Sequence, residues 1–118
     1  AGIDYIKHPE TVASFVATDE EKAVAYLHDV IEDTSLTLLD LKKEGFSKNI
    51  IEAVDILTKK KGQDYQSYLN LVKTNELARV VKLADLRHNS DLTRLPLITE
   101  KNLERNKKYI QAIHYLNK

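Results

Sequence analysis

The chain has 118 residues, of which 18 are basic and 18 are acidic, so its formal net charge is zero. This length suits one domain with its own core, and the balanced charge argues against a protein that binds duplex nucleic acid through a basic surface. The absence of cysteine excludes disulfides and thiolate chemistry. We therefore expect a single domain over residues 1–118 in which His, Asp and Glu carry any reaction.

No apolar run approaches the roughly 20 residues that a membrane-spanning helix needs, and no secretory leader begins at Ala1. We expect a cytoplasmic protein with no membrane contact, and the oligomeric state stays open. The sequence contains no methionine, which indicates a chain that starts inside a longer one. The domain would then be incomplete at its N-terminus and would lack a first helix.

Few glycines and prolines and a charged fraction of 31% predict an all-α protein, a compact bundle of several helices. Pro9 suits the first turn of a helix that reaches about residue 17. Thr18 with Glu21 three residues later forms a capping box, so the next helix should cover residues 19–33.

The central part of the chain contains the predicted starts of two further helices. Thr37 begins a short third helix that Gly45 closes, and we expect the following Phe46 to fill the core. Ser47 caps a fourth helix that ends near residue 57.

The second half of the sequence predicts three more helices. One runs from about residue 64 to residue 74, and Asn75 caps a long one over residues 76 to about 94, which Pro96 ends. Thr99 caps the last helix.

The second helix ends in an unusual polar run on an otherwise apolar helix. Helical spacing groups one imidazole and three carboxylates with a small residue, Ala25, and we expect the apolar Val24, Leu27 and Ile31 on the opposite side. The grouped polar residues are His28, Asp29, Glu32 and Asp33. For Glu32 and Asp33, solvated acids at a helix end are the simpler alternative.

A second anomaly is Asp85, which lies on the same apolar helix face as Val81. Burying an uncompensated carboxylate costs several kcal/mol, so Asp85 needs a cation, a proton or a metal. Lys82 one turn earlier is a purely structural partner. A cation shared with His28 and Asp29 would explain both anomalies together.

His8, next to the rigid Pro9, adds a second imidazole to this set. Two imidazoles and two carboxylates suit Mn²⁺ or Fe²⁺, while Zn²⁺ and Mg²⁺ stay open. Such an ion can lower the pKa of a bound water to roughly 7 and polarise a phosphoryl oxygen, as metal-dependent hydrolases do.

Three sequence blocks carry a family resemblance: Asp4-Tyr5-Ile6-Lys7-His8-Pro9, Leu27-His28-Asp29-Val30-Ile31-Glu32-Asp33-Thr34, and Val81-Lys82-Leu83-Ala84-Asp85 with His88-Asn89. In this order they resemble the HD-domain metal-dependent phosphohydrolases. They are most similar to the hydrolase domain of bifunctional (p)ppGpp synthetase/hydrolases and to small alarmone hydrolases. The resemblance implies an HD-domain bundle that removes the 3′-pyrophosphate of a (p)ppGpp-like nucleotide with Mn²⁺ as its cofactor.

The resemblance also implies a role for each matching residue. The metal ligands would be His8, His28, Asp29 and Asp85. Glu32 and Asp33 would position or activate the attacking water. Substrate contacts would come from Tyr5 in the pocket lining, Asn89 near the nucleotide sugar, and Lys82, which orients phosphate or simply pairs with Asp85.

Two departures bear on the substrate, because Leu86 and Asp91 stand where alarmone hydrolases usually carry basic residues. One alternative is therefore a hydrolase of another nucleotide phosphate. A second is a non-catalytic, nucleotide-sensing helical module whose metal site is structural or vestigial. Tyr65 and Tyr68, at helical spacing, are expected in the core rather than as a platform for a nucleotide base.

Overall fold

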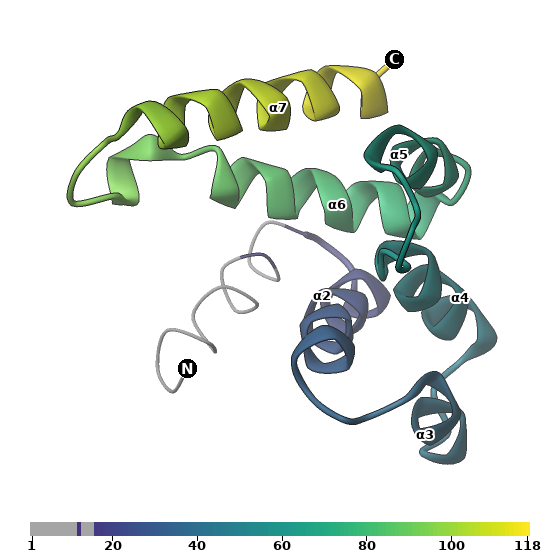
Figure 1. The fold of residues 1–118 in the computed structure, drawn as a ribbon. Helices are drawn as coiled ribbons and strands as arrows, with labels where there is room; N and C mark the ends of the chain where they lie inside the picture. The colour runs from purple at the N-terminus through teal and green to yellow at the C-terminus, as the bar shows by residue number, and fades with distance from the viewer. Residues whose placement is uncertain (1–11, 13–15) are drawn as a thin grey trace.

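Every regular element in the described part of the chain, Val12 and residues 16–118, is a helix (Figure 1). The computed structural model contains α2 (Asp19–Asp33), α3 (Leu38–Lys43), α4 (Lys48–Leu57), α5 (Tyr65–Lys73), α6 (Glu76–Asn89), the short 3₁₀ helix η1 (Leu92–Arg94) and α7 (Glu100–Leu116). The prediction of an all-α bundle is confirmed. The helix expected from Pro9 falls largely outside the described residues.

Side-chain caps set the starts of these helices, as the sequence predicts. At α2 the Thr18 hydroxyl accepts a hydrogen bond from the Glu21 amide at 3.1 Å, and the Glu21 carboxylate accepts one from the Thr18 amide at 2.9 Å. The same reciprocal arrangement opens α3 and α7, and single side-chain caps open α4, α5 and α6. Each cap satisfies amides that have no partner within the helix.

The predicted end of the sixth helix near residue 94 is wrong, because α6 ends at Asn89. Just beyond it, the Asp91 carboxylate accepts a hydrogen bond from the Thr93 amide at 3.0 Å. When an aspartate side chain accepts a hydrogen bond from a nearby backbone amide, that amide has a partner outside the helical pattern, and the helix can end. The chain therefore turns before Pro96 and forms only η1 in between.

The expectation that Phe46 fills the core is also wrong, because its side chain is exposed. Gly45, with φ of +90°, does turn the chain after α3 as predicted. However, α3 packs only against α4 among the closely packed helix pairs, and it lies at the edge of the bundle (Figure 1). Phe46, which follows this peripheral helix, therefore lies at the surface.

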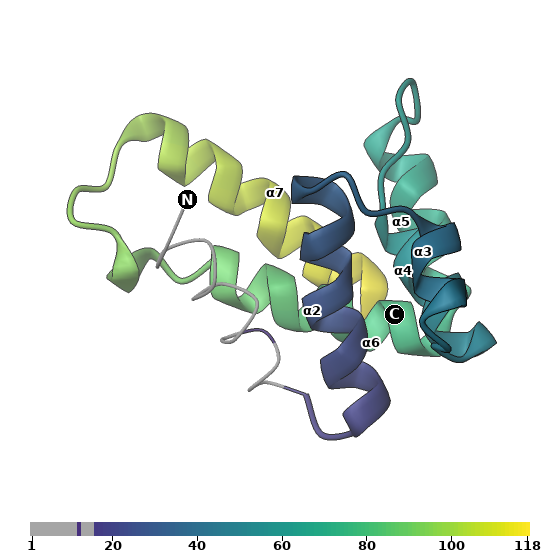
Figure 2. The same cartoon turned by 90° about the horizontal axis from the view of Figure 1, so that it is seen from below.

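Helix α6 lies at the centre of the bundle and packs against α2, α4, α5 and α7. Helix α7 runs along one side of α6 and α2 crosses the other side, which the two views show together (Figures 1 and 2). The most deeply buried large side chains come from five helices: Val24, Val54, Leu57, Val72, Val81, Leu86 and Leu116. This shared core fixes α2 against α6.

Within the described residues, no helix combines the length and the apolar character needed to cross a membrane.

The capping box of α2 predicts a pH-dependent stability. Hydrogen bonds to Thr18 lower the pKa of Glu21 below its ordinary value of 4.5, so its contribution is present above pH 4.5 and is lost as pH falls through the lowered pKa. Glu21→Gln should lower the free energy of unfolding at neutral pH by less than about 1 kcal/mol. In urea unfolding, this difference from wild type should vanish in acid.

Glu20→Gln removes a charge from the same helical turn and is the matched control. A loss as large as that of Glu21→Gln would assign the effect to the charge at the helix start instead of the capping box.

Candidate functional site

Helix α2 buries His28 on the face that packs into the bundle. The buried residues of this helix are Val24, Ala25 and His28. The expectation that Val24 lies opposite His28 is therefore wrong, since residues four positions apart share one face of a helix. The imidazole lies next to core side chains and needs partners for its two nitrogens within the protein.

Both nitrogens of His28 lie near carboxylates of the same helix. Nε2 donates to Glu32 Oε1 at 3.0 Å, and Nδ1 lies 4.0 Å from Asp29 Oδ1. The His28 side chain is 9% exposed and that of Glu32 is 42% exposed. The hydrogen bond from His28 lowers the pKa of the Glu32 carboxyl below its ordinary value. Glu32 is therefore more than a solvated acid at a helix end.

On α6, Lys82 and Asp85 form a buried ion pair. Lys82 Nζ lies 3.2 Å from Asp85 Oδ2, and the two side chains are 13% and 11% exposed. Burial by itself would lower the pKa of Lys82, but Asp85 together with Tyr68 and Tyr65 outweighs this effect, so the pKa lies above its ordinary value. The lysine is charged, and the structural pairing weighed from the sequence is present.

These two groups lie close to each other because α2 packs on α6. The charge of Lys82 lowers the pKa of Glu32 and the charge of Asp85 raises it, so both lie within electrostatic reach of that carboxyl. The structure thus brings five of the predicted site residues together, which we call the α2–α6 polar cluster: His28, Asp29, Glu32, Lys82 and Asp85.

Four other predicted residues lie elsewhere. Tyr5 and His8 fall outside the described residues. Asp33 is the exposed last residue of α2, and Asn89 is the half-buried last residue of α6. They therefore lie at helix ends, and their assigned roles in activating water and contacting the sugar stay predictions.

The donor types of the cluster, one imidazole and two carboxylates, suit Mn²⁺ or Fe²⁺. Among Val12 and residues 16–118, however, no three His, Asp or Glu side chains form a group that could hold a metal ion. Asp85 is instead paired with Lys82, and His28 with Glu32. A metal centre here would need a further donor, the role predicted for His8, and a change in the hydrogen bond between His28 Nε2 and Glu32.

Two tyrosines extend the cluster beyond the residues predicted from the sequence. The ring centroid of Tyr68 lies 5.3 Å from Lys82 Nζ, and Tyr65 stacks on Tyr68 with ring centroids 5.9 Å apart. Tyr68 is buried as expected, but Tyr65 is 39% exposed, against the expectation that it lies in the core. No periodicity within α5 reveals this contact, because it depends on how α5 packs against α6.

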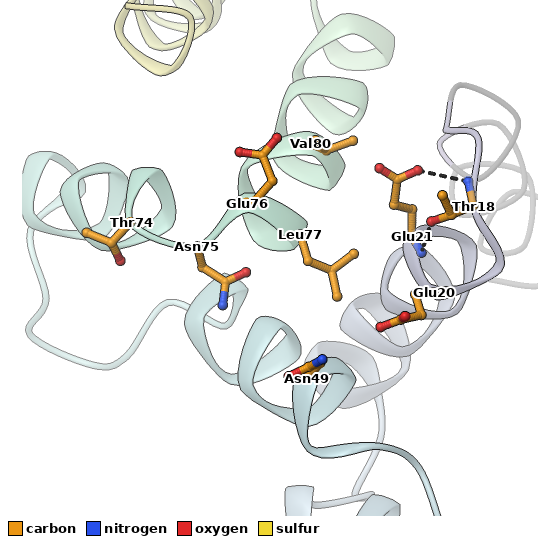
Figure 3. A pocket seen from close by; sticks show the side chains of 9 residues that line it. All are labelled: Thr18, Glu20, Glu21, Asn49, Thr74, Asn75, Glu76, Leu77 and Val80. Carbon is orange, nitrogen blue, oxygen red and sulfur yellow. Dashed lines mark hydrogen bonds between the residues drawn. The ribbon is translucent and has the colours of Figure 1, made fainter.

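A separate pocket of about 430 Å³ opens where α2, α4 and α6 begin (Figure 3). Three of its lining residues are glutamates and none is Lys or Arg: Thr18, Glu20, Glu21, Asn49, Thr74, Asn75, Glu76, Leu77 and Val80. Carboxylates repel a polyanionic ligand. The pocket contains no residue of the α2–α6 polar cluster, and its charge does not suit a phosphorylated nucleotide.

The chain is similar to the guanosine-3′,5′-bis(diphosphate) 3′-pyrophosphohydrolase of Haemophilus influenzae. The two are 36% identical over 104 aligned residues, which cover 75% of this chain and 15% of the relative. The chain thus spans a small part of the length of that protein, which is by its name a hydrolase. No protein-family model matches the chain.

The buried ion pair predicts an asymmetric response to mutation. Asp85→Ala leaves the Lys82 ammonium buried without its carboxylate and should lower the free energy of unfolding by about 3–5 kcal/mol. Replacing both partners, with Lys82→Met and Asp85→Leu, should cost far less, because no charge remains to be desolvated. Urea unfolding in metal-free buffer measures both values. Equal losses in the single and double variants would contradict the pairing.

Proposed function

We propose that this chain is the catalytic part of a metal-dependent phosphohydrolase of the HD type that acts on a phosphorylated nucleotide. The substrate we propose first is a (p)ppGpp-like alarmone, from which water would release the 3′-pyrophosphate. The observation that carries the proposal is the packing of α2 on α6, which brings His28, Asp29 and Glu32 to Asp85. The similarity to a pyrophosphohydrolase supports the same reaction.

In this proposal His28, Asp29 and Asp85 hold the metal together with His8. A bound Mn²⁺ would supply an acidified water and a polarised phosphoryl oxygen. Fe²⁺, Zn²⁺ and Mg²⁺ stay open as alternatives. Two packed helices provide three of these donors, so the rigid core of the bundle would set the spacing between them.

The protein side chains would divide the remaining work. Glu32 is ionised at neutral pH, and its carboxylate would orient the attacking water; because its pKa is lowered, orientation would be its main task rather than accepting the proton. Asp33, the next residue, would assist from the end of α2. The Lys82 ammonium would pair with phosphate oxygens, while Tyr5 and Asn89 would contact the nucleotide. Water is the nucleophile, and no covalent enzyme intermediate is needed.

One observation favours a different nucleotide phosphate as the substrate. Leu86, at a position that is usually basic in alarmone hydrolases, is fully buried and belongs to the core. A phosphate therefore meets no cation from this position. The chemistry of the α2–α6 polar cluster would be unchanged, and only the set of anionic groups that the protein recognises would differ.

The test of the function is product analysis after incubating the full chain with Mn²⁺ and (p)ppGpp. We expect release of pyrophosphate, its loss in His28→Ala, and a decrease of about 10²- to 10⁴-fold in kcat in Glu32→Gln, because Glu32 orients the water. Glu104→Gln, which changes an exposed carboxylate of α7, is the matched control and should retain full activity.

The same assay with nucleoside monophosphates separates the alternatives. Hydrolysis of a monophosphate without pyrophosphate release from (p)ppGpp would establish the other substrate class. A chain that binds a nucleotide but hydrolyses none would be the non-catalytic sensing module.

Metal binding has its own test, which needs no substrate. An ion that binds only the folded state at 100 times its Kd stabilises that state by about 2.7 kcal/mol, so Mn²⁺ should raise the unfolding temperature. His28→Ala and Asp85→Asn should abolish this increase, whereas Glu104→Gln should retain it. Thermal unfolding with and without Mn²⁺ decides the point, and an increase that survives both site variants would place the ion elsewhere.

A further inference from the structure

The Lys82 ammonium is constrained on two sides. Asp85 Oδ2 lies 3.2 Å from Nζ on one side, and the Tyr68 ring lies 5.3 Å from Nζ, measured to its centroid, on another. An ammonium within about 6 Å of a ring centroid is attracted by the electron-rich face of the ring. The interaction strengthens when both partners are withdrawn from water, as Lys82 and Tyr68 are.

The Tyr68 ring is itself fixed in place. Its hydroxyl donates to the carbonyl oxygen of Leu57 at 2.8 Å, which ties α5 to the end of α4. Tyr65 stacks on it with an interplanar angle of 26°. Burial raises the pKa of the Tyr68 hydroxyl to about 12, so the ring stays neutral at physiological pH. Lys82 therefore faces a rigid aromatic surface.

The position of the ammonium matters because a second carboxylate, that of Glu32, lies within its electrostatic range. The charge of Lys82 lowers the pKa of Glu32. The four flexible carbons of a lysine side chain allow its ammonium to approach different partners. Attraction to the Tyr68 ring adds to the ion pair with Asp85 and holds the ammonium in the position that the structure shows. The ring thus reduces the freedom of the ammonium.

We propose that Tyr68 is a positioning residue whose ring holds the Lys82 ammonium next to Asp85, as the cation that a phosphate group meets at the α2–α6 polar cluster. The inference rests on the proposed function, which brings the phosphate to this cluster. A phosphate there adds negative charge to a place that already contains Asp29, Glu32 and Asp85. A pre-positioned cation offsets that charge without first losing side-chain entropy.

The test replaces Tyr68 in the full chain by phenylalanine and by phenylalanines that carry one, two or three ring fluorines. Fluorine withdraws electron density from the ring face while nearly preserving its shape, so folding and core packing stay matched across the series. The probe is inorganic pyrophosphate, titrated by calorimetry in the presence of Mn²⁺. Circular dichroism checks that every variant is folded.

Tyr68→Phe should bind pyrophosphate within about twofold of wild type, because it retains the ring. Each added fluorine should weaken binding, and the total loss should lie between about twofold and thirtyfold, the range that corresponds to a cation–π contact. In a Lys82→Met background the same series should give a constant affinity. A structural role of Tyr68 alone would not produce this dependence on Lys82.

A constant affinity across the fluorinated series, or an equal decline without Lys82, would overturn the inference, as would a wild-type chain that binds no pyrophosphate. The binding readout does not require hydrolysis. An inactive chain whose affinity follows the fluorine content would therefore refute the proposed function alone, whereas an active chain with a flat series would refute only the role of Tyr68.

Discussion

The buried ion pair between Lys82 and Asp85 constrains everything around it. Both side chains are almost fully withdrawn from water on the central helix of the bundle, and an isolated charge there would cost several kcal/mol. The neighbouring elements satisfy this constraint in different ways. Helix α5 contributes the face of the Tyr68 ring, and α2 contributes the Glu32 carboxylate, which lies within electrostatic range of both charges.

Stability alone gives no reason for such a cluster. Well-packed apolar residues in place of a buried ion pair are often neutral or stabilising, and the core around α6 is otherwise mainly aliphatic. A cluster that contains His28 and the acids of two helices is therefore a candidate for a chemical role. In the acidic pocket at the start of α2, two of the three glutamates have structural partners, because Glu21 takes part in capping and Glu76 pairs with Arg79.

The sequence predicts best those features that depend on a few consecutive residues. The starts of α2, α3, α4 and α7 follow from caps whose donor and acceptor lie three positions apart. The predictions fail where a competing hydrogen bond or the packing of distant elements determines a helix end or the burial of a side chain. The Asp91 turn shortens α6, and the peripheral position of α3 leaves Phe46 exposed.

The same division applies to the candidate site. The sequence by itself determined which residue types occupy α2 and α6, and it marked Asp85 as a carboxylate in need of a partner, because helical spacing follows directly from residue order. Only the tertiary structure decided that Lys82 is that partner, that Glu32 bonds His28, and that Tyr68 faces Lys82. The Lys82–Asp85 and His28–Glu32 pairs each lie within one helix, but their burial and the contact with Tyr68 depend on how α2 and α5 pack against α6, which core side chains from five helices determine together.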